Sequence, residues 1–321
     1  MDYTTFGRTG LRVSVAGLGC GGFSRLGTTT GKSTAESVAI VKLAIESGIN
    51  LIDTAPSYGT EAIVGQGISG VPRDSLVIAT KCTIERDGEM FTPARVVESL
   101  HASLRKLGTD HVDIFQLHGV ALAQYDRAMT EIVPVLLRER ERGSFRYLGI
   151  TEAGPTDQDH VMLSRAAADG VWDSVMVAFN MLHRTAMDRL YPLTLKNGVG
   201  TLVMHAVRRI FAQPDLLAEA VRVLAAEGRV PRELANDPHP LDFLVHEGGA
   251  ESVTDAAYRF ARYSSGVDVV LFGTGSPEHL RANVASLSRP PLPPEDVAKL
   301  LALFANVSGL GLEAHGRPPV G

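Results

Sequence analysis

The chain has 321 residues, of which 45% are hydrophobic, and it carries a formal net charge of −5. This length and composition allow a large buried core. The mildly acidic balance, with no long run of either sign, argues against nucleic acid or a membrane surface as the main partner and allows a neutral small molecule. No segment approaches the ~18 consecutive apolar residues that cross a bilayer.

Cysteine usage and the start of the chain indicate a compartment. Only Cys20 and Cys82 are present, and the opening MDYTTFGRTG lacks the apolar stretch of a secretory signal. Two cysteines are too few for a disulfide framework. We therefore expect a soluble cytoplasmic protein.

The first predicted element is a small β-hairpin. Residues 3–14, YTTFGRTGLRVS, place a glycine-rich turn between two short extended runs. We expect this hairpin to close the floor of the fold that follows.

After the hairpin one pattern recurs: a helix ends at a glycine, and a short run rich in Val, Ile, Leu and Phe follows. The glycines are Gly48, Gly108, Gly143, Gly170, Gly198 and Gly266. Glycine just past a helix supplies the left-handed cap, and a short apolar run suits a strand that is covered on both faces. Two further apolar runs, at residues 11–19 and 75–81, bring the predicted strands to eight.

Helix start signals support this pattern. Ser33 and Glu36 form a capping box ahead of an apolar stripe, and Thr92 with Pro93 opens a helix that Gly108 closes. Strands that alternate with helices predict one parallel sheet.

Eight such units favour a closed (β/α)8 TIM barrel over an open doubly wound sheet. We expect a single barrel domain over residues 1–321, with the N-terminal β-hairpin and with long loops at the C-terminal face. Residues 206–250 are too long for a simple connection, so they are expected to add a loop over that face. The segment after Ser308, rich in Gly and Pro, is expected to be loosely ordered.

The segment GLGCGG at residues 17–22 also fits the glycine fingerprint of the open dinucleotide-binding fold. No apolar helical stripe starts at Gly22, and Asp53 comes later than the ~20 residues that the fingerprint requires. The segment is therefore interpreted as the end of the first barrel strand.

Active groups of parallel barrels come from the C-terminal ends of the strands. The polar residues at the predicted strand ends are Asp53, Lys81, His118, Thr151, Glu152 and Asn180, with Tyr58 shortly after Asp53. A structural ion pair, a packed aromatic and a buried histidine would explain Asp53, Lys81, Tyr58 and His118 one at a time. Their occurrence at successive strand ends favours a shared site.

These four side chains suit carbonyl reduction. A free tyrosine has a pKa near ~10, and an adjacent ammonium lowers it, so Lys81 would activate Tyr58 as the proton donor. Asp53 would keep Lys81 charged, and His118 would orient the substrate oxygen. The hydride must come from a cofactor because no side chain carries one.

At these residues the sequence resembles the aldo-keto reductase superfamily over nearly its whole length. The matching segments are NLIDTAPSYG, VIATK, DIFQLHG, RYLGITEAG, AFNMLHR and FGTGSPEHLRANV. The resemblance implies that Asp53, Tyr58, Lys81 and His118 form the catalytic tetrad.

The resemblance also implies a set of cofactor residues. Gly19, Cys20 and Gly21 would line the nicotinamide ribose, Thr151, Glu152 and Asn180 would face the carboxamide, and His279 and Asn283 would lie near the adenosine. Independently, Gly273 and Gly275 precede a helix that starts at Ser276 and Pro277, which is a natural phosphate site.

The sequence departs from the family pattern at four places. Glu152 replaces an Asn, Met176 replaces a Gln, and His279 replaces an Arg that clamps the 2′-phosphate in many relatives. HAVRR, residues 205–209, replaces Ser-Pro-Leu after the seventh strand, so His205, Val207 and Arg208 are assigned to the cofactor rim. Pyrophosphate binding and a solvent-facing position explain Arg208 and Arg209 equally well.

The expected function is reversible NAD(P)H-dependent reduction of an aldehyde or ketone, with NADPH favoured and NADH as the alternative. Competing hypotheses are an NAD(P)+-dependent sugar dehydrogenase, a cofactor-binding redox sensor with little turnover, and a lyase or isomerase that uses Lys81 as a Schiff base. No histidine shows metal-ligand spacing, so no metal is expected.

Overall fold

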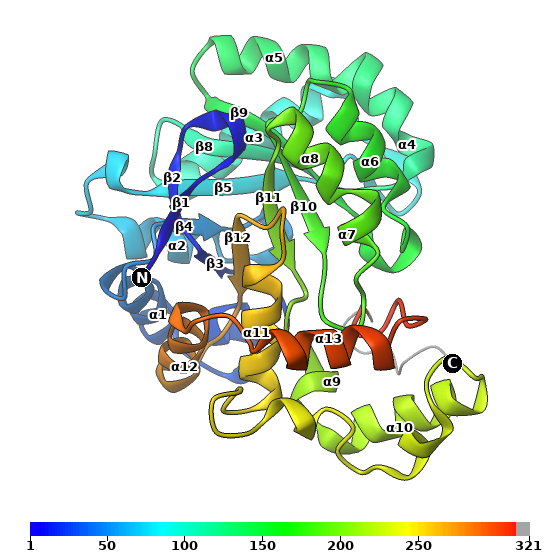
Figure 1. Cartoon of the computed structure of the whole chain (residues 1–321). Coiled ribbons are helices and arrows are strands. Elements are labelled where there is room, and N and C mark those ends of the chain that lie inside the picture. The colour runs from blue at the N-terminus through cyan, green and yellow to red at the C-terminus, as the bar shows by residue number, and fades with distance from the viewer. Residues whose placement is uncertain (313–321) are drawn as a thin grey trace.

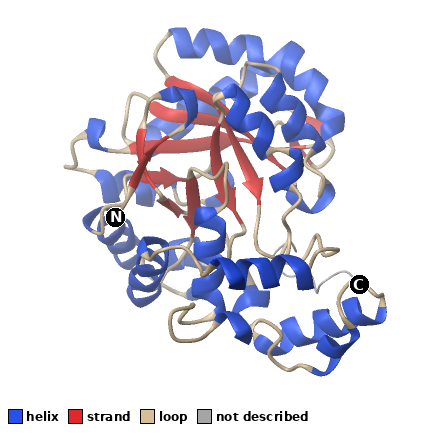
Figure 2. Ribbon diagram, viewed as in Figure 1, coloured by secondary structure: helices blue, strands red, loops and turns tan. Residues whose placement is uncertain are grey.

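The computed structural model describes residues 1–312, and its centre is a closed barrel of parallel strands (Figures 1 and 2). The strands are β3 (Ala16–Gly19), β4 (Leu51–Asp53), β5 (Val77–Cys82), β8 (Val112–Val120), β9 (Phe145–Glu152), β10 (Ser174–Ala178), β11 (Gly200–Met204) and β12 (Val269–Phe272). Each strand pairs with the next in chain order, and β12 closes the ring against β3. The predicted TIM barrel is confirmed. A single domain over residues 1–321 stays a prediction.

Helices cover the outside of the barrel and connect its strands (Figure 2). They are α1 (Thr34–Glu46), α2 (Glu61–Ile68), α3 (Pro93–Leu107), α4 (Leu122–Arg127), α5 (Val133–Glu141), α6 (Val161–Ala168), α7 (Ala186–Arg189), α8 (Tyr191–Asn197), α11 (Val253–Tyr263) and α12 (Pro277–Ser288). The strands read as apolar runs because they are covered on both faces: every residue of β5 and of β10 is buried.

The predicted helix ends are confirmed. At the start of α1, Ser33 Oγ accepts from Glu36 N while the Glu36 carboxylate accepts from Ser33 N, which completes the capping box. The six predicted cap glycines all have positive φ, from 64° to 95°. That backbone region is costly for other residues, so these glycines fix where each helix stops.

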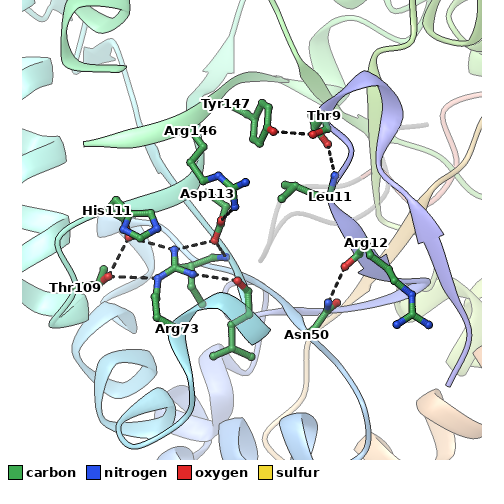
Figure 3. Close-up of polar contacts among 12 residues, drawn as sticks. Thr9, Leu11, Arg12, Asn50, Arg73, Thr109, His111, Asp113, Arg146 and Tyr147 are labelled. Carbon is green, nitrogen blue, oxygen red and sulfur yellow. Dashed lines mark hydrogen bonds and ion pairs between the residues drawn. The ribbon is translucent and has the colours of Figure 1, made fainter. Parts of the chain in front are cut away.

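The N-terminal hairpin closes the barrel floor, as predicted. It pairs β1 (Tyr3–Thr5) with β2 (Arg12–Ser14), and Phe6 at its turn is completely buried in the lower core of the barrel. In Figure 3, Tyr147 from β9 donates its hydroxyl to the carbonyl of Thr9, 2.6 Å away. The apolar run 11–19, predicted as one strand, is divided: residues 12–14 belong to the hairpin and residues 16–19 to the barrel.

The long connection after β11 is largely helical rather than a plain loop. It contains α9 (Arg209–Ala212) and α10 (Pro214–Ala226), and α13 (Pro294–Leu303) follows α12. Figure 1 shows α9, α10 and α13 together at the end of the barrel toward which the β10 arrow points. The sequence underestimated this helix content because α10 packs its apolar face on neighbouring elements.

Two smaller features complete the described chain. A short antiparallel pair, β6 (Glu85–Arg86) and β7 (Glu89–Met90), lies in the connection after β5. Of the predicted loose tail after Ser308, residues 309–312 are described, and residues 313–321 lie outside the described residues. In residues 1–312 no helix combines the length and the apolar character that a membrane span needs.

Candidate active site

The structure brings Asp53, Tyr58, Lys81 and His118 into one cluster at the C-terminal end of the barrel. Lys81 Nζ donates to Asp53 Oδ2 at 2.6 Å and to the Thr54 carbonyl at 3.0 Å. The same ammonium lies 4.9 Å from the centre of the Tyr58 ring. The Tyr58 hydroxyl is 3.3 Å from His118 Nε2. The phenol therefore has an ammonium on one side and an imidazole on the other.

Short local structures place these side chains. Asp53 ends β4, and the 3₁₀ turn Pro56–Tyr58 ends at Gly59, whose φ is 73°, so the chain returns Tyr58 to the strand end that it has just left. Lys81 and His118 come from β5 and β8, which are neighbours in the barrel.

Gln116 is a site residue that the sequence reasoning missed. Its Nε2 donates to Asp53 Oδ1 at 3.2 Å, so the Asp53 carboxylate is held from both sides. Its Oε1 is buried and has no hydrogen-bond partner among the described residues. A signal was present: Gln116 lies two positions before His118 in a strand, and side chains two apart point to the same face.

The electrostatics of the cluster follow from burial and from the Asp53–Lys81 pair. Burial disfavours the Lys81 ammonium, but Asp53 and Tyr58 outweigh it, so the pKa of Lys81 is raised. Burial raises the pKa of Tyr58 and Lys81 opposes that rise only in part, so the lowered Tyr58 pKa expected from the sequence is wrong for the protein without cofactor. Burial, aided by Lys81, lowers the pKa of His118 to about 3, so this imidazole is neutral at neutral pH.

The predicted ribose residues lie beside the cluster. Gly19 pairs with Asp53 across β3 and β4, and Cys20 N donates to the Asp53 carbonyl at 2.8 Å. A side chain on Gly21 would lie 2.7 Å from the Tyr58 ring, so the absence of one leaves room for the phenol. The Cys20 thiol is completely buried, and burial raises its pKa.

The predicted carboxamide residues end β9 and follow its neighbour β10. Thr151 Oγ1 accepts from Gly119 N at 2.7 Å. Both oxygens of Glu152 already have protein partners, which are the backbone N–H of Ala178 and the imidazole of His160, each at 2.8 Å. Asn180 is buried, its Nδ2 donates to the Leu310 carbonyl at 3.0 Å, and its Oδ1 accepts from Leu182 N at 2.8 Å.

The residues assigned to the rest of the cofactor follow β11 and β12, and they are called the rim here. Gly273 is exposed, and a side chain there would lie 2.9 Å from the Gly19 carbonyl, so the rim presents backbone next to the cluster. A side chain on Gly275 would lie 2.4 Å from Gly27 Cα, in the turn after β3.

The helix α12 starts where it was predicted, because Ser276 Oγ accepts from His279 N at 3.1 Å. His279 is exposed and Asn283 is half-buried. After β11, His205, Val207 and Arg208 are half-buried, and His205 has a φ of 67°. Arg208 is the residue just before α9.

Met176 lies in the lower core of the barrel, where it contributes no amide group. Across residues 1–312 no group of three or more His, Cys, Asp or Glu side chains is arranged to hold a metal ion.

Comparison with known proteins gives a consistent result. Residues 17–304 match the model of the Aldo/keto reductase family. The chain is 33% identical to an L-galactose dehydrogenase of Arabidopsis thaliana over 63% of this chain and 64% of that protein, so the match spans just under two thirds of that relative. It is 28% identical to an NADH-specific methylglyoxal reductase of Escherichia coli over 75% of this chain and 79% of that protein.

The fold agrees with solved structures. The holo form of an aldo-keto reductase of Bacillus halodurans superposes with a TM-score of 0.71 at 22% identity, covering 96% of this chain and 98% of that one. At 22% identity this similarity shows the fold alone. The family assignment rests on the family model, which matches most of the chain. The chain therefore belongs to the aldo/keto reductase family and is an oxidoreductase.

Proposed function

We propose that this enzyme reduces an aldehyde or ketone to an alcohol, reversibly, with Tyr58 as the general acid. The observation that carries the proposal is the position of the Tyr58 hydroxyl, 3.3 Å from His118 Nε2, with the Lys81 ammonium against its ring. A phenol in this setting has both an orienting partner and a positive charge that stabilises the phenolate.

The residues of the rim fit a nicotinamide dinucleotide. Backbone rather than side chains borders the cluster at Gly19, Gly21 and Gly273, which allows a ligand to approach closely. When bound, the dinucleotide supplies the hydride that no side chain carries. We propose that Gly19, Cys20 and Gly21 hold its ribose. Its carboxamide would be held by Thr151, Glu152 and Asn180, and its phosphates and adenosine by His205, Val207, Arg208, Gly273, Gly275, His279 and Asn283.

The four central residues then carry out the proton transfer and orient the substrate. Tyr58 gives its proton to the substrate oxygen as negative charge develops there. Lys81 stabilises the phenolate that remains, and Asp53 keeps Lys81 charged. His118, neutral because of its lowered pKa, donates a hydrogen bond that orients the substrate oxygen. In the reverse direction the Tyr58 phenolate accepts the proton of the alcohol.

The test is turnover with a panel of small carbonyl compounds, following the loss of reduced-cofactor absorbance. Tyr58→Phe keeps the ring and removes the proton, so we expect the rate to fall by at least about 10²-fold. We expect its dissociation constant for the reduced cofactor to stay within about twofold of wild type. Full turnover by Tyr58→Phe would refute the role of Tyr58, and absence of turnover in the wild type would favour the redox-sensing alternative.

A second candidate is physiological oxidation of a sugar. The 33% identity to an L-galactose dehydrogenase favours it, because the same site runs in both directions. Steady-state rates with aldoses and NAD(P)+, compared at neutral pH with rates of carbonyl reduction, separate the two.

For the cofactor we propose NADPH. Arg281 lies exposed on α12 and offers a cationic partner to a 2′-phosphate, and His279 is an exposed hydrogen-bonding side chain on the first turn of the same helix. Glu278, which accepts from Ser276 Oγ at 2.7 Å, adds a negative charge there and favours NADH. Binding titrations of NADPH and NADH decide between these opposed effects.

A further inference from the structure

Gln116 is a buried amide that has no part in the proton transfer proposed above. It lies on β8 and is completely buried, a position that costs free energy for a polar side chain unless it forms hydrogen bonds. Gly149 lies opposite it in the neighbouring β9, and a side chain there would lie 2.8 Å from Gln116 Cγ. The absence of a side chain at Gly149 therefore leaves room for the amide inside the barrel.

The Gln116 amide is directed at Asp53. Its Nε2 donates to Asp53 Oδ1 at 3.2 Å. A carboxylate can only accept hydrogen bonds, so the N–H end of the amide has to face it. The opposite end, Oε1, is buried and has no hydrogen-bond partner in residues 1–312. Within that part of the chain, the bond to Asp53 is the polar contact that offsets the burial of this side chain.

The two oxygens of the Asp53 carboxylate have different partners. Oδ2 accepts from Lys81 Nζ at 2.6 Å, and Oδ1 accepts from Gln116. Because Gln116 occupies Oδ1, the carboxylate is kept from turning to offer both oxygens to Lys81. Two of the three N–H groups of the ammonium donate to Asp53 and to the Thr54 carbonyl. One N–H therefore remains for the Tyr58 phenol, whose ring centre is 4.9 Å from Nζ.

The same hydrogen bond supports the charge of Asp53. Burial raises the pKa of Asp53, and the hydrogen bonds from Lys81 and Gln116 oppose that rise. Loss of the Gln116 donor raises the pKa of Asp53 further. A carboxyl that takes up a proton no longer keeps Lys81 charged, and a carboxylate that turns draws the ammonium away from Tyr58. Both responses remove stabilisation from the Tyr58 phenolate, so they act in the same direction.

We propose that Gln116 is a positioning residue, whose amide fixes the Asp53 carboxylate so that Lys81 stays charged and keeps an N–H group for Tyr58. The inference rests on the proposed function, since that function assigns the proton transfer to Tyr58. Gln116 acts through Asp53 and Lys81 in turn and not by contact with a ligand. Its removal therefore changes the proton affinity of the phenol and leaves substrate binding intact.

The first test measures the charge of Asp53 in the protein without cofactor and needs no turnover. With 13C-labelled aspartate, nuclear magnetic resonance follows the carboxyl signals through a pH titration, and the Asp53 signal is the one that Asp53→Asn lacks. Gln116→Met keeps the length of the side chain and removes the amide, so we expect the pKa of Asp53 to rise by about one unit. An unchanged pKa of Asp53 would overturn the inference.

The second test is the pH dependence of alcohol oxidation, in which the Tyr58 phenolate accepts the proton. Only part of the change at Asp53 reaches the phenol. We therefore expect the rise of kcat with pH to move upward by about half a unit in Gln116→Met, which lowers kcat about threefold at pH 7. The KM for the alcohol is expected to stay within about twofold of wild type, because no ligand contact is lost.

The matched control for this profile is Ile114→Met. Ile114 lies two positions before Gln116 on the same face of β8 and is also completely buried. The substitution repacks the barrel interior at nearly constant volume and leaves the amide in place. Its pH profile is expected to coincide with that of wild type. An equal displacement in Ile114→Met would assign the effect to packing and refute the inference.

A double variant tests the route through Asp53. Asp53→Asn has no carboxylate for the amide to hold, so adding Gln116→Met to it is expected to lower kcat by less than about 1.5-fold. The same threefold loss in both backgrounds would show that Gln116 acts by another route, which contradicts the inference. If the wild type neither oxidises alcohols nor reduces carbonyl compounds, the proposed function fails, and the titration of Asp53 still tests Gln116. If Gln116→Met does not fold, Gln116→Leu, which also lacks the amide, replaces it in each measurement.

Discussion

Lys81 keeps its charge although its side chain has no exposure to solvent. The buried ammonium is stabilised by its hydrogen bonds to Asp53 Oδ2 at 2.6 Å and to the Thr54 carbonyl at 3.0 Å. Asp53 in turn depends on Lys81 and Gln116. Removing either charge leaves the other buried without a counter-ion, which costs far more than the pair itself contributes.

At this scale we predict strong coupling between Asp53 and Lys81. Asp53→Asn and Lys81→Met are each expected to lower the free energy of unfolding by about 3 kcal/mol, since each leaves one uncompensated buried charge. The double variant leaves none, so its loss is expected to be smaller than the sum by more than about 1 kcal/mol. Urea denaturation of the four proteins measures this. Additive losses would show that the pair is not electrostatically coupled.

At the scale of elements, one carboxylate ties three neighbouring segments together near the barrel floor. Asp113, at the start of β8, is 1% exposed. Its carboxylate accepts hydrogen bonds from Arg73 Nη2 at 2.7 Å, from Arg146 Nη1 at 3.0 Å and from Ile78 N at 2.8 Å. Figure 3 shows the two guanidinium groups approaching this carboxylate from different elements. The contacts fix the register of β5, β8 and β9 at the end opposite the site.

Asp113→Ala is therefore expected to destabilise the fold by about 3 kcal/mol, because it leaves a buried backbone N–H and two guanidinium groups without their acceptor. The matched control is Arg146→Gln. The Arg146 side chain is 51% exposed, so its loss is expected to cost under about 1 kcal/mol. Thermal and urea unfolding give both values, and equal losses would argue against burial as the cause.

At the scale of the whole molecule, the N-terminal hairpin packs against the strands at the barrel floor. Gly7 approaches so closely that a side chain there would lie 2.4 Å from Gly200 N. Asp268, just before β12, accepts from the backbone N–H groups of Thr201 and Gly7, and it therefore joins the hairpin to β11. Burial raises the pKa of Asp268 to about 6.

This carboxyl gives the folded protein a pH dependence with a definite sign. A raised pKa means that the folded state holds the proton more tightly than the unfolded chain, so the contribution of Asp268 is complete below about pH 4 and declines as pH rises through 6. Asp268→Asn keeps an acceptor without a charge. We expect it to be more stable than wild type by about 2 kcal/mol at pH 7 and equal to it near pH 4. A constant difference at both pH values would contradict this.

The amino-acid sequence by itself determined the local features. The positive φ at Gly48 and Gly108, the caps at Ser33 and Thr92, and the apolar strands follow from the conformational limits and hydration of single residues and their near neighbours. Because the C-terminal ends of parallel strands meet at one edge, the pattern also indicated that Asp53, Lys81 and His118 lie together, as the structure has them.

Tertiary structure alone decided the contacts between groups far apart in the chain. The Gln116 amide on Asp53, the Leu310 carbonyl on Asn180 and the His160 imidazole on Glu152 depend on where side chains point after packing. The helical content of residues 206–250 was missed for the same reason, since the apolar face of α10 is stabilised by neighbours that only the folded chain provides. Periodicity and capping are local properties, whereas burial and the pairing of polar groups belong to the completed barrel.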